Sequence, residues 1–311
     1  MGMQAWWFPG QGAQSVGMGR ALYEHVPEAR AVFERADEAL GFSLSKLCFE
    51  GPIDELTRTE NAQPALVTVG YACLEALRSR LPLRDASFAA GHSLGEYTAL
   101  VSAGVLTLED AVRTVRLRGQ AMQAAVREGE GAMAAILAMD EDTVRALCED
   151  AAEGEVVAPA NFNAPGQIVI AGHTAAVARA AALAKTRGGR AIPLKVSAPF
   201  HCDLMKPAET PVAEALGKLT MGAMRIPVIA NVNALAYGSA ADTSKRLVDQ
   251  IACPVRWADS VQFMHAEGVR LAFEFGPGGV LAGLAKRIAP SLEVIGVHDM
   301  ASLDNALERL S

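Results

Sequence analysis

The residue best placed to do chemistry is Ser93, in the sequence Gly91-His92-Ser93-Leu94-Gly95. A short apolar run precedes this motif, and a helix-compatible segment follows it to Ala103. The pattern predicts a strand, a tight turn and a helix with Ser93 at the apex, an arrangement known as a nucleophile elbow. The helix start would direct free N–H groups, including that of Leu94, at developing negative charge. Because Gly-x-Ser-x-Gly also arises by chance, an ordinary turn stays open as the alternative.

Among the six histidines, His201 stands out as a candidate base. It follows Ser197-Ala198-Pro199-Phe200, a proline-constrained segment that can hold a side chain in a fixed direction. The chain is predicted to return there from an inserted subdomain to the main one, and catalytic clefts tend to form at such junctions. Any single histidine taken alone is more often a satisfied core or surface residue.

Arg118 belongs to the apolar face of a helix predicted over residues 108–127. The apolar residues at helical spacing are Leu108, Val112, Val115, Met122 and Val126. Steps of three or four residues add Arg118 and Gly119 to this stripe, whereas Arg113 and Arg116 lie well away from it and can face solvent. A buried guanidinium needs an anionic partner. Periodicity alone favours an internal salt bridge to Asp or Glu, and a carboxylate on a substrate is the alternative.

Several amide side chains lie in predicted loops or at element ends. Gln11 stands between two glycines in the loop 9–14, so the backbone there can approach a ligand closely, although an ordinary β-to-α turn is the alternative. Gln63 precedes Pro64 at the predicted start of a helix over 63–81. The segment 161–167, Asn-Phe-Asn-Ala-Pro-Gly-Gln, is predicted as a turn that either lines a cleft or satisfies its own backbone.

The elements that must position these residues form an α/β pattern. Residues 132–196 read as strand, helix, strand, strand, helix and strand, which is the order of a ferredoxin-like subdomain inserted into a larger one. Around it, strands are predicted at 4–8, 227–232, 270–275 and 293–297, and helices at 20–25, 27–40, 244–251, 261–266 and from the glycines near 278 through 287. This alternation predicts a parallel sheet covered by helices.

Composition excludes several classes of protein. With 311 residues, 51% hydrophobic and 20% charged, the chain is expected to form a compact globular fold. It has no apolar run of membrane-spanning length and no basic leader with a cleavage site, so we expect no membrane association and a cytoplasmic location. Its five scattered cysteines predict neither a disulfide framework nor a zinc site. The net charge of −7 argues against nucleic acid as a partner.

The chain resembles the malonyl-CoA:acyl carrier protein transacylase family over essentially its full length. The resemblance rests on several motifs in the same order, at residues 8–14, 59–65, 91–97, 118–123, 161–167, 198–201, 254–257 and 274–278. Many motifs in order are far more specific than any one of them. The resemblance implies an α/β-hydrolase-like subdomain over 1–128 and 198–311, a ferredoxin-like subdomain over 129–197, and an active site between them.

The resemblance also implies catalytic roles. Ser93 would be the nucleophile and His201 its general base, with the backbone carbonyl of Gln250 holding the second ring nitrogen of His201 in place of a carboxylate. The N–H groups of Leu94 and Gln11 would form the oxyanion hole. The reaction would be a ping-pong transfer through a malonyl-serine intermediate, with the CoA thioester as a substrate and no cofactor or metal.

For substrate binding, the resemblance assigns Arg118 to the malonyl carboxylate, and acetyl-CoA would then leave the guanidinium buried without a partner. The bulk of Phe200 would exclude an α-methyl branch. Gln63, His92 and Asn163 would line the acyl pocket. The carrier proteins of such enzymes are acidic, so docking would need local positive charge. The candidates near the cleft rim are Arg187, Arg190, Lys195, Lys286 and Arg287, with an ordinary surface role as the alternative for each.

Other functions stay open from sequence alone. A discrete polyketide synthase acyltransferase with another extender unit, or a serine thioesterase, would share the elbow and the base. A catalytically silent carrier-binding module is a third possibility, and the joint presence of Ser93, His201 and Arg118 argues against it. The sequence does not separate fatty acid from polyketide synthesis. Nothing such as a heptad indicates assembly, so we expect a monomer.

Overall fold

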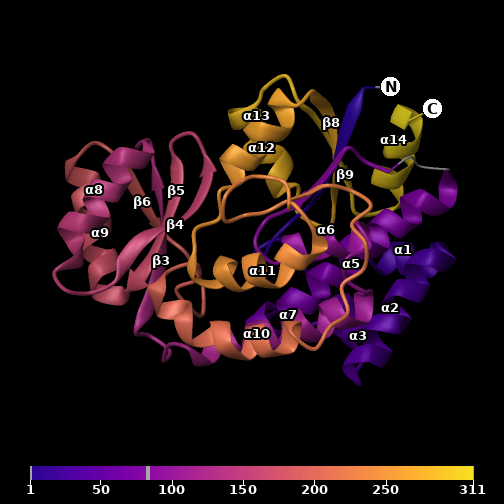
Figure 1. The fold of residues 1–311 in the computed structure, drawn as a ribbon, viewed down its shortest axis with the longest axis horizontal. Helices are drawn as coiled ribbons and strands as arrows, with labels where there is room; N and C mark the ends of the chain where they lie inside the picture. The colour runs from indigo at the N-terminus through magenta and orange to yellow at the C-terminus, as the bar shows by residue number, and fades with distance from the viewer. Residues whose placement is uncertain (1, 82–84, 311) are drawn as a thin grey trace.

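The computed structural model describes residues 2–81 and 85–310 and contains two β-sheets (Figure 1). The larger sheet has the strand order β7-β2-β1-β8-β9, and each of its neighbouring pairs is parallel. Its strands are β1 (Met3–Phe8), β2 (Phe88–Gly91), β7 (Val228–Ile229), β8 (Val269–Phe275) and β9 (Glu293–Val297). The predicted parallel α/β arrangement is therefore confirmed.

Helices cover both faces of this sheet because alternate residues of its strands point to opposite sides. Trp6 and Phe8 of β1 belong to the larger hydrophobic core, whereas Ala5 and Trp7 belong to a second core on the other face. The larger core includes residues of α2 (Pro27–Leu40), α5 (Thr59–Arg80), α6 (Gly95–Ser102), α7 (Leu108–Ala124) and α14 (Met300–Leu310). The second includes residues of α12 (Trp257–Ala266) and α13 (Val280–Ile288).

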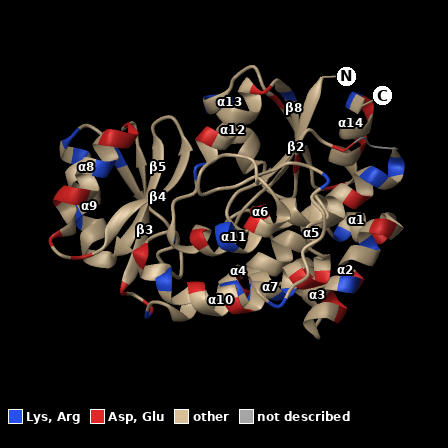
Figure 2. Ribbon diagram, in the orientation of Figure 1, with Lys and Arg blue, Asp and Glu red and all other residues tan. Residues whose placement is uncertain are grey.

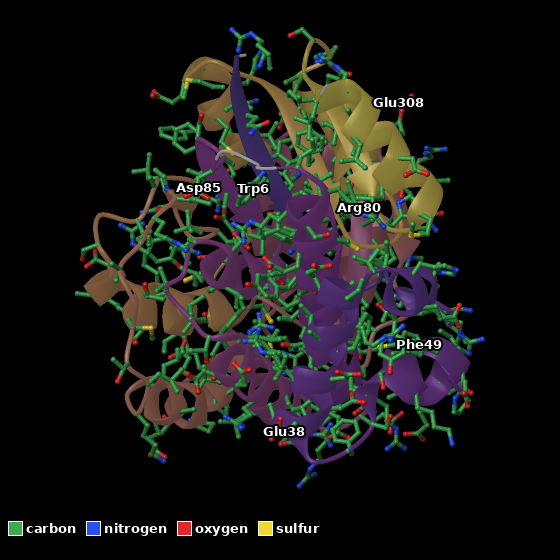
Figure 3. All side chains as sticks on the ribbon, turned by 90° about the vertical axis from the view of Figure 1, so that its right-hand side faces the viewer. Trp6, Glu38, Phe49, Arg80, Asp85 and Glu308 are labelled. Atoms are coloured by element: carbon green, nitrogen blue, oxygen red, sulfur yellow. The ribbon has the colours of Figure 1, made fainter. Side chains whose placement is uncertain are left out.

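Charged residues lie mainly on the outer helices, and the strands carry few of them (Figure 2). In the view of Figure 3, Glu38 of α2 and Glu308 of α14 lie at the outside of the molecule, and both are exposed. Trp6 is only 1% exposed. None of the helices within 2–81 and 85–310 combines the length and apolar character needed to span a bilayer.

Helix α5 begins at Thr59, four residues before the predicted start at Gln63. Pro64 therefore lies inside the helix rather than at its first turn. A proline removes one helical N–H donor, and burial along almost the whole of α5 offsets that loss. The consequence for the site is that Gln63 lies in the second turn of a rigid, buried helix, where it is 1% exposed.

Other element boundaries also differ from prediction. Helix α7 ends at Ala124 rather than at residue 127, and β7 spans two residues rather than six. Six elements were not predicted, five of them in segments of eight residues or fewer. They are α3 (Leu44–Glu50), α4 (Ile53–Thr57), η1 (Asp203–Ala208), α10 (Glu209–Leu216), η2 (Ala240–Asp242) and α14. The predicted helices at 20–25 and 244–251 correspond to α1 (Arg20–His25) and α11 (Thr243–Ala252).

The second sheet is antiparallel and has the strand order β4-β5-β3-β6. It follows the predicted order of strands and helices. The elements are β3 (Gly131–Leu137), α8 (Glu141–Ala152), β4 (Val157–Ala164), β5 (Gln167–His173), α9 (Thr174–Thr186) and β6 (Arg190–Pro193). Residues of α8 and α9 form a separate core with this sheet. Figure 1 shows it beside the larger sheet, with α11 between them.

Strand β4 extends four residues beyond its predicted end and joins the two parts of the molecule. Asn161 and Asn163 are strand residues rather than turn residues, and the turn between β4 and β5 is confined to Pro165 and Gly166. The extension is stabilised by main-chain hydrogen bonds to Val255, which lies outside the small sheet: Phe162 N–H donates to the Val255 carbonyl at 2.8 Å, and Val255 N–H donates to the Ala160 carbonyl at 2.9 Å. A neighbour distant in sequence therefore lengthens the strand.

Candidate active site

The turn between β2 and α6 has the geometry of a nucleophile elbow. Ser93 has φ of 52°, a left-handed conformation that is unfavourable for a residue with a Cβ. A Cβ on Gly91 would lie 1.9 Å from the carbonyl carbon of Gly95, and one on Gly95 would lie 2.2 Å from the carbonyl oxygen of Phe8. Both glycines are therefore required by close backbone contact. The strand-turn-helix prediction is confirmed.

Asn231 braces the elbow from the segment after β7. Its side-chain Oδ1 accepts a hydrogen bond from the Ser93 N–H at 2.7 Å, and its Nδ2 donates to the Gly91 carbonyl at 2.7 Å. These two bonds satisfy the N–H of the strained residue and a carbonyl two residues before it. Sequence reasoning missed Asn231, because nothing in the local pattern marks it.

The structure brings together Ser93 and His201, which are 108 residues apart in the sequence. Ser93 Oγ lies 2.8 Å from His201 Nε2, and His201 Nδ1 lies 2.8 Å from the backbone carbonyl oxygen of Gln250. Because a carbonyl only accepts, Nδ1 carries the proton and Nε2 is free to accept the serine proton. Burial, together with the nearby charge of Arg118, lowers the pKa of His201 to about 3. The imidazole is therefore neutral near pH 7, as a general base must be.

A cavity lies beside Ser93, and the two residues expected to form the oxyanion hole are among those that line it. Leu94 and Gln11 both line this cavity. Within residues 2–81 and 85–310, neither N–H donates to another protein group. The loop of Gln11 lies close to the elbow, since a Cβ on Gly10 would be 2.7 Å from the His92 carbonyl oxygen. The two N–H groups are thus available for an oxygen atom near Ser93 Oγ.

Arg118 is 1% exposed, as its place on the apolar stripe of α7 predicts. Its Nη1 donates to Gln63 Oε1 at 2.8 Å, and its Nη2 donates to Gln250 Oε1 at 2.8 Å and to Ser93 Oγ at 3.1 Å. No described residue forms a salt bridge with it, so the internal ion pair favoured by periodicity is wrong. Two neutral amide oxygens accept from the guanidinium instead. Its Nε is buried without a partner among the described atoms.

These contacts also correct an expectation about acetyl groups. A substrate without a carboxylate does not leave Arg118 without partners, because Gln63 and Gln250 accept from its Nη atoms. The penalty for binding such a substrate is therefore smaller than that of an orphaned charge. Two other arginines of α7 were expected to face solvent. Arg113 is exposed, whereas Arg116 is half-buried and donates to Asn61 Oδ1 at 3.1 Å.

The predicted pocket residues divide into two groups. Gln63, His92 and Phe200 line the cavity with Ser93. Asn163 is not among the residues that line the cavity, whereas Asn161 is. Asn161 and Asn163 are two residues apart on β4, and the strand pairing is irregular between Phe162 and Ala164, so regular alternation does not fix the directions of the two side chains. Asn163 Oδ1 instead lies 2.8 Å from His92 Nε2 and holds that ring in place.

The proposed docking cations lie on exposed surfaces, and several have partners. Lys195 lines the cavity. Arg287 donates to Gln167 Oε1 at 2.6 Å and to the Pro165 carbonyl at 2.8 Å, so it holds the β4–β5 turn. Arg187 pairs with Asp150 at 2.5 Å. No cluster of His, Cys, Asp or Glu in the described part of the chain could hold a metal ion.

In this site a strained serine hydrogen-bonds to one nitrogen of a histidine, and a backbone carbonyl accepts from the other nitrogen. Enzymes use this arrangement for acyl transfer through serine. The acyl transferase domain model matches residues 5–286, and the chain belongs to this acyl transferase family. The malonyl CoA-acyl carrier protein transacylase of Bacillus subtilis is 48% identical over 98% of this chain and 96% of its own.

Solved structures agree with this assignment. An acyl carrier protein S-malonyltransferase from Vibrio cholerae has a TM-score of 0.95 and 46% identity, covering 97% of this chain and 99% of its own. A malonyl-transacylase in complex with a type II polyketide synthase acyl-carrier protein has a TM-score of 0.96 and 44% identity, with 99% of both chains covered. The similarity therefore extends over the whole chain in each case.

Proposed function

We propose that this protein transfers a malonyl group from malonyl-CoA to the phosphopantetheine thiol of an acyl carrier protein. The observation that carries the proposal is the buried guanidinium of Arg118, which lies beside Ser93 without a carboxylate partner among the described residues. A fixed cation 3.1 Å from the serine oxygen suits an acyl group that ends in a carboxylate. The names of the relatives support the same substrate and carrier.

In the first half-reaction, His201 Nε2 accepts the Ser93 proton while Oγ bonds to the thioester carbonyl carbon. The carbonyl oxygen gains negative charge, which the N–H groups of Leu94 and Gln11 stabilise. The Gln250 carbonyl holds the imidazolium through Nδ1. Collapse of the tetrahedral intermediate breaks the carbon–sulfur bond, and the sulfur of CoA takes the proton from His201.

In the second half-reaction, the carrier thiol gives its proton to His201 Nε2, and its sulfur attacks the malonyl-serine carbonyl. The same two N–H groups stabilise the oxyanion, and Ser93 leaves as it regains the proton. The product is a malonyl thioester on the carrier. Water must be excluded between the two halves, because water attack would release malonate.

Arg118 and Phe200 set the acyl specificity. The malonyl carboxylate takes the place of an amide oxygen on the guanidinium, and the unpartnered Nε gives a further donor for it. Phe200 lines the same cavity and excludes an α-methyl branch by its bulk. The reaction needs no cofactor, since the thioester itself is the activated substrate.

The site lies between two subdomains, an α/β-hydrolase-like one over 1–128 and 198–311 and a ferredoxin-like one over 129–197. Cavity residues from both parts support this division, with Ser93 and Arg118 from the first and Met133 and Asn161 from the second. The strand order of the small sheet is that of a ferredoxin-like fold. Exposed Arg190, Lys195 and Lys286 are the candidates for binding an acidic carrier.

The protein works as a monomer in the cytoplasm, for fatty acid or polyketide synthesis, with malonyl-CoA and the carrier protein as its partners. The five cysteines are all free, which suits a reducing compartment. Four of them are buried.

The test is to incubate the enzyme with malonyl-CoA and a carrier protein that bears phosphopantetheine, and to measure the products by mass. We expect malonyl-carrier protein from the native enzyme and none above background from Ser93→Ala. Release of free malonate without malonyl-carrier protein would identify a hydrolase and contradict the proposal.

A further inference from the structure

Glu96 is a buried carboxylate one helical turn from Ser93, and the reaction described above does not use it. It lies in the first turn of α6 and is 0% exposed. Its Oε1 accepts a hydrogen bond from the Tyr237 hydroxyl. Its Oε2 accepts from Gln250 Nε2 at 2.7 Å and from Asn231 N–H at 3.1 Å. Three neutral donors thus hold a carboxyl group in the centre of the protein.

The Gln250 side chain joins Glu96 to Arg118. Its Nε2 donates to Glu96 Oε2 and to the Ser93 carbonyl oxygen at 3.0 Å, while its Oε1 accepts from Arg118 Nη2 at 2.8 Å. Glu96 Oε2 offers only an acceptor in this contact, and a guanidinium only donates. One orientation of the amide satisfies both neighbours, whereas the flipped amide would place donor against donor and acceptor against acceptor. Glu96 Oε2 therefore helps to fix the face of Gln250 that meets Arg118.

The same oxygen also supports the catalytic pair. Asn231, whose N–H bonds to Glu96 Oε2, accepts from the Ser93 N–H through its side chain. The backbone carbonyl of Gln250 accepts from His201 Nδ1. Loss of Glu96 would loosen the elbow and the base for every acyl group. Loss of the contact between Glu96 and Gln250 would in addition free the Arg118 guanidinium to move. Only substrates with a carboxylate depend on the orientation of Arg118.

We propose that Glu96 is a positioning residue for acyl selection, which acts through Gln250 to orient Arg118 toward the acyl group on Ser93. This inference rests on the proposed malonyl transfer. The proposed role depends on the hydrogen bond that Oε2 accepts from Gln250, not on the charge of the carboxylate. A glutamine at position 96 also has an oxygen that can accept this bond, so it should orient Gln250 in the same way. Tyr237 binds the other oxygen, and its contact is not part of the link to Arg118.

The test compares acylation of Ser93 by malonyl-CoA and by acetyl-CoA, read as the ratio of the two kcat/KM values. For Glu96→Leu we expect both rates to fall and the ratio to fall by about tenfold or more, because a hydrogen bond to a charged group is lost from the Arg118 site. Glu96→Gln should keep the ratio within about threefold of the native value, since it retains the acceptor. Tyr237→Phe, the matched control on the same carboxyl group, should also keep it.

A double variant tests whether Glu96 acts through Gln250. Gln250→Met keeps the backbone carbonyl for His201 and removes the amide link, so we expect the same loss of ratio as in Glu96→Leu. Adding Glu96→Leu to Gln250→Met should lower the ratio no further. If Glu96→Leu does not fold, as judged by circular dichroism and thermal unfolding, Gln250→Met tests the step from Gln250 to Arg118, and a native ratio in that variant overturns the inference.

The inference would be overturned if kcat/KM fell by the same factor for malonyl-CoA and acetyl-CoA, both in folded Glu96→Leu and in Gln250→Met. Glu96 would then be a structural residue. Failure of the proposed function looks different. In that case the native enzyme itself forms no malonyl-carrier protein. A third result separates the two. If the native enzyme transfers malonyl and Arg118→Ala has a lower malonyl-to-acetyl ratio, but Gln250→Met keeps the native ratio, then only the inference about Glu96 is wrong.

Discussion

Replacing Arg118 by alanine tests how the acyl group is selected. The guanidinium already donates to two neutral amide oxygens of the protein, those of Gln63 and Gln250. The bonds at Nη1 and Nη2 are therefore exchanged rather than gained when a malonyl carboxylate binds, and the net gain is the bond to the unpartnered Nε. One hydrogen bond to a charged group contributes about 1.5 to 3 kcal/mol.

We therefore expect Arg118→Ala to weaken malonyl transfer by about 1.5 to 3 kcal/mol, or about 10- to 150-fold in kcat/KM. Acetyl transfer should change much less, because acetyl offers nothing to the guanidinium. The assay is single-turnover acylation of Ser93, followed by intact mass, with each CoA thioester. Arg113→Ala is the matched control, since Arg113 is exposed on the same helix. Equal losses for malonyl and acetyl groups would refute the reasoning and make Arg118 a structural arginine.

Two further predictions concern pH. Because the pKa of His201 is lowered to about 3, the acylation rate should be nearly the same at about pH 7.5 and about pH 6, whereas a histidine with a pKa of about 6.5 would lose about three-quarters of the rate. A loss of that size in stopped-flow acylation would contradict the neutral base. Burial raises the pKa of Glu96 to about 7, above the value of about 4.5 in the unfolded chain, so its protonated form is favoured in the native state. As pH rises through about 7, Glu96 ionises in the native protein and the free energy of unfolding falls. Glu96→Gln has no proton to lose at this position, so its free energy of unfolding lacks this fall. Urea unfolding measures the free energy of unfolding of Glu96→Gln minus that of the native protein. Between about pH 5 and about pH 8 this difference should shift by about 2 to 3 kcal/mol in favour of the variant, and a difference that does not change with pH would refute the raised pKa.

The elbow and the burial of Arg118 were predictable because each depends on a local pattern. Gly91 and Gly95 are required by contacts within a few residues of Ser93 or with β1. The position of Arg118 follows from helical spacing along α7 alone. The alternating order of strands and helices likewise gave both sheets. Local periodicity and turn chemistry are what a single sequence records most directly.

The side-chain partners of these residues could not be predicted from periodicity or spacing, because they come from distant segments. The family resemblance pointed to Gln63 as a pocket residue and to the backbone carbonyl of Gln250, but not to their bonds with Arg118 and not to Asn231. Gln63, Gln250 and Asn231 reach the site from α5, α11 and the segment after β7, and no spacing relates them. The choice of amide oxygens rather than a carboxylate for Arg118 is a property of this tertiary arrangement. The turn predicted at 161–167 was misplaced for a similar reason, since contacts with Val255 extend β4 beyond its own sequence signal.

The most direct test of the account is to trap the acyl-enzyme. The protein is mixed with malonyl-CoA in the absence of a carrier, quenched in acid, digested and mapped by mass spectrometry. The account predicts a malonyl group on the peptide that contains Ser93, and its loss when carrier protein is added before the quench, with malonyl-carrier protein as the product. A malonyl group on another residue, or transfer that continues in Ser93→Ala, would contradict it.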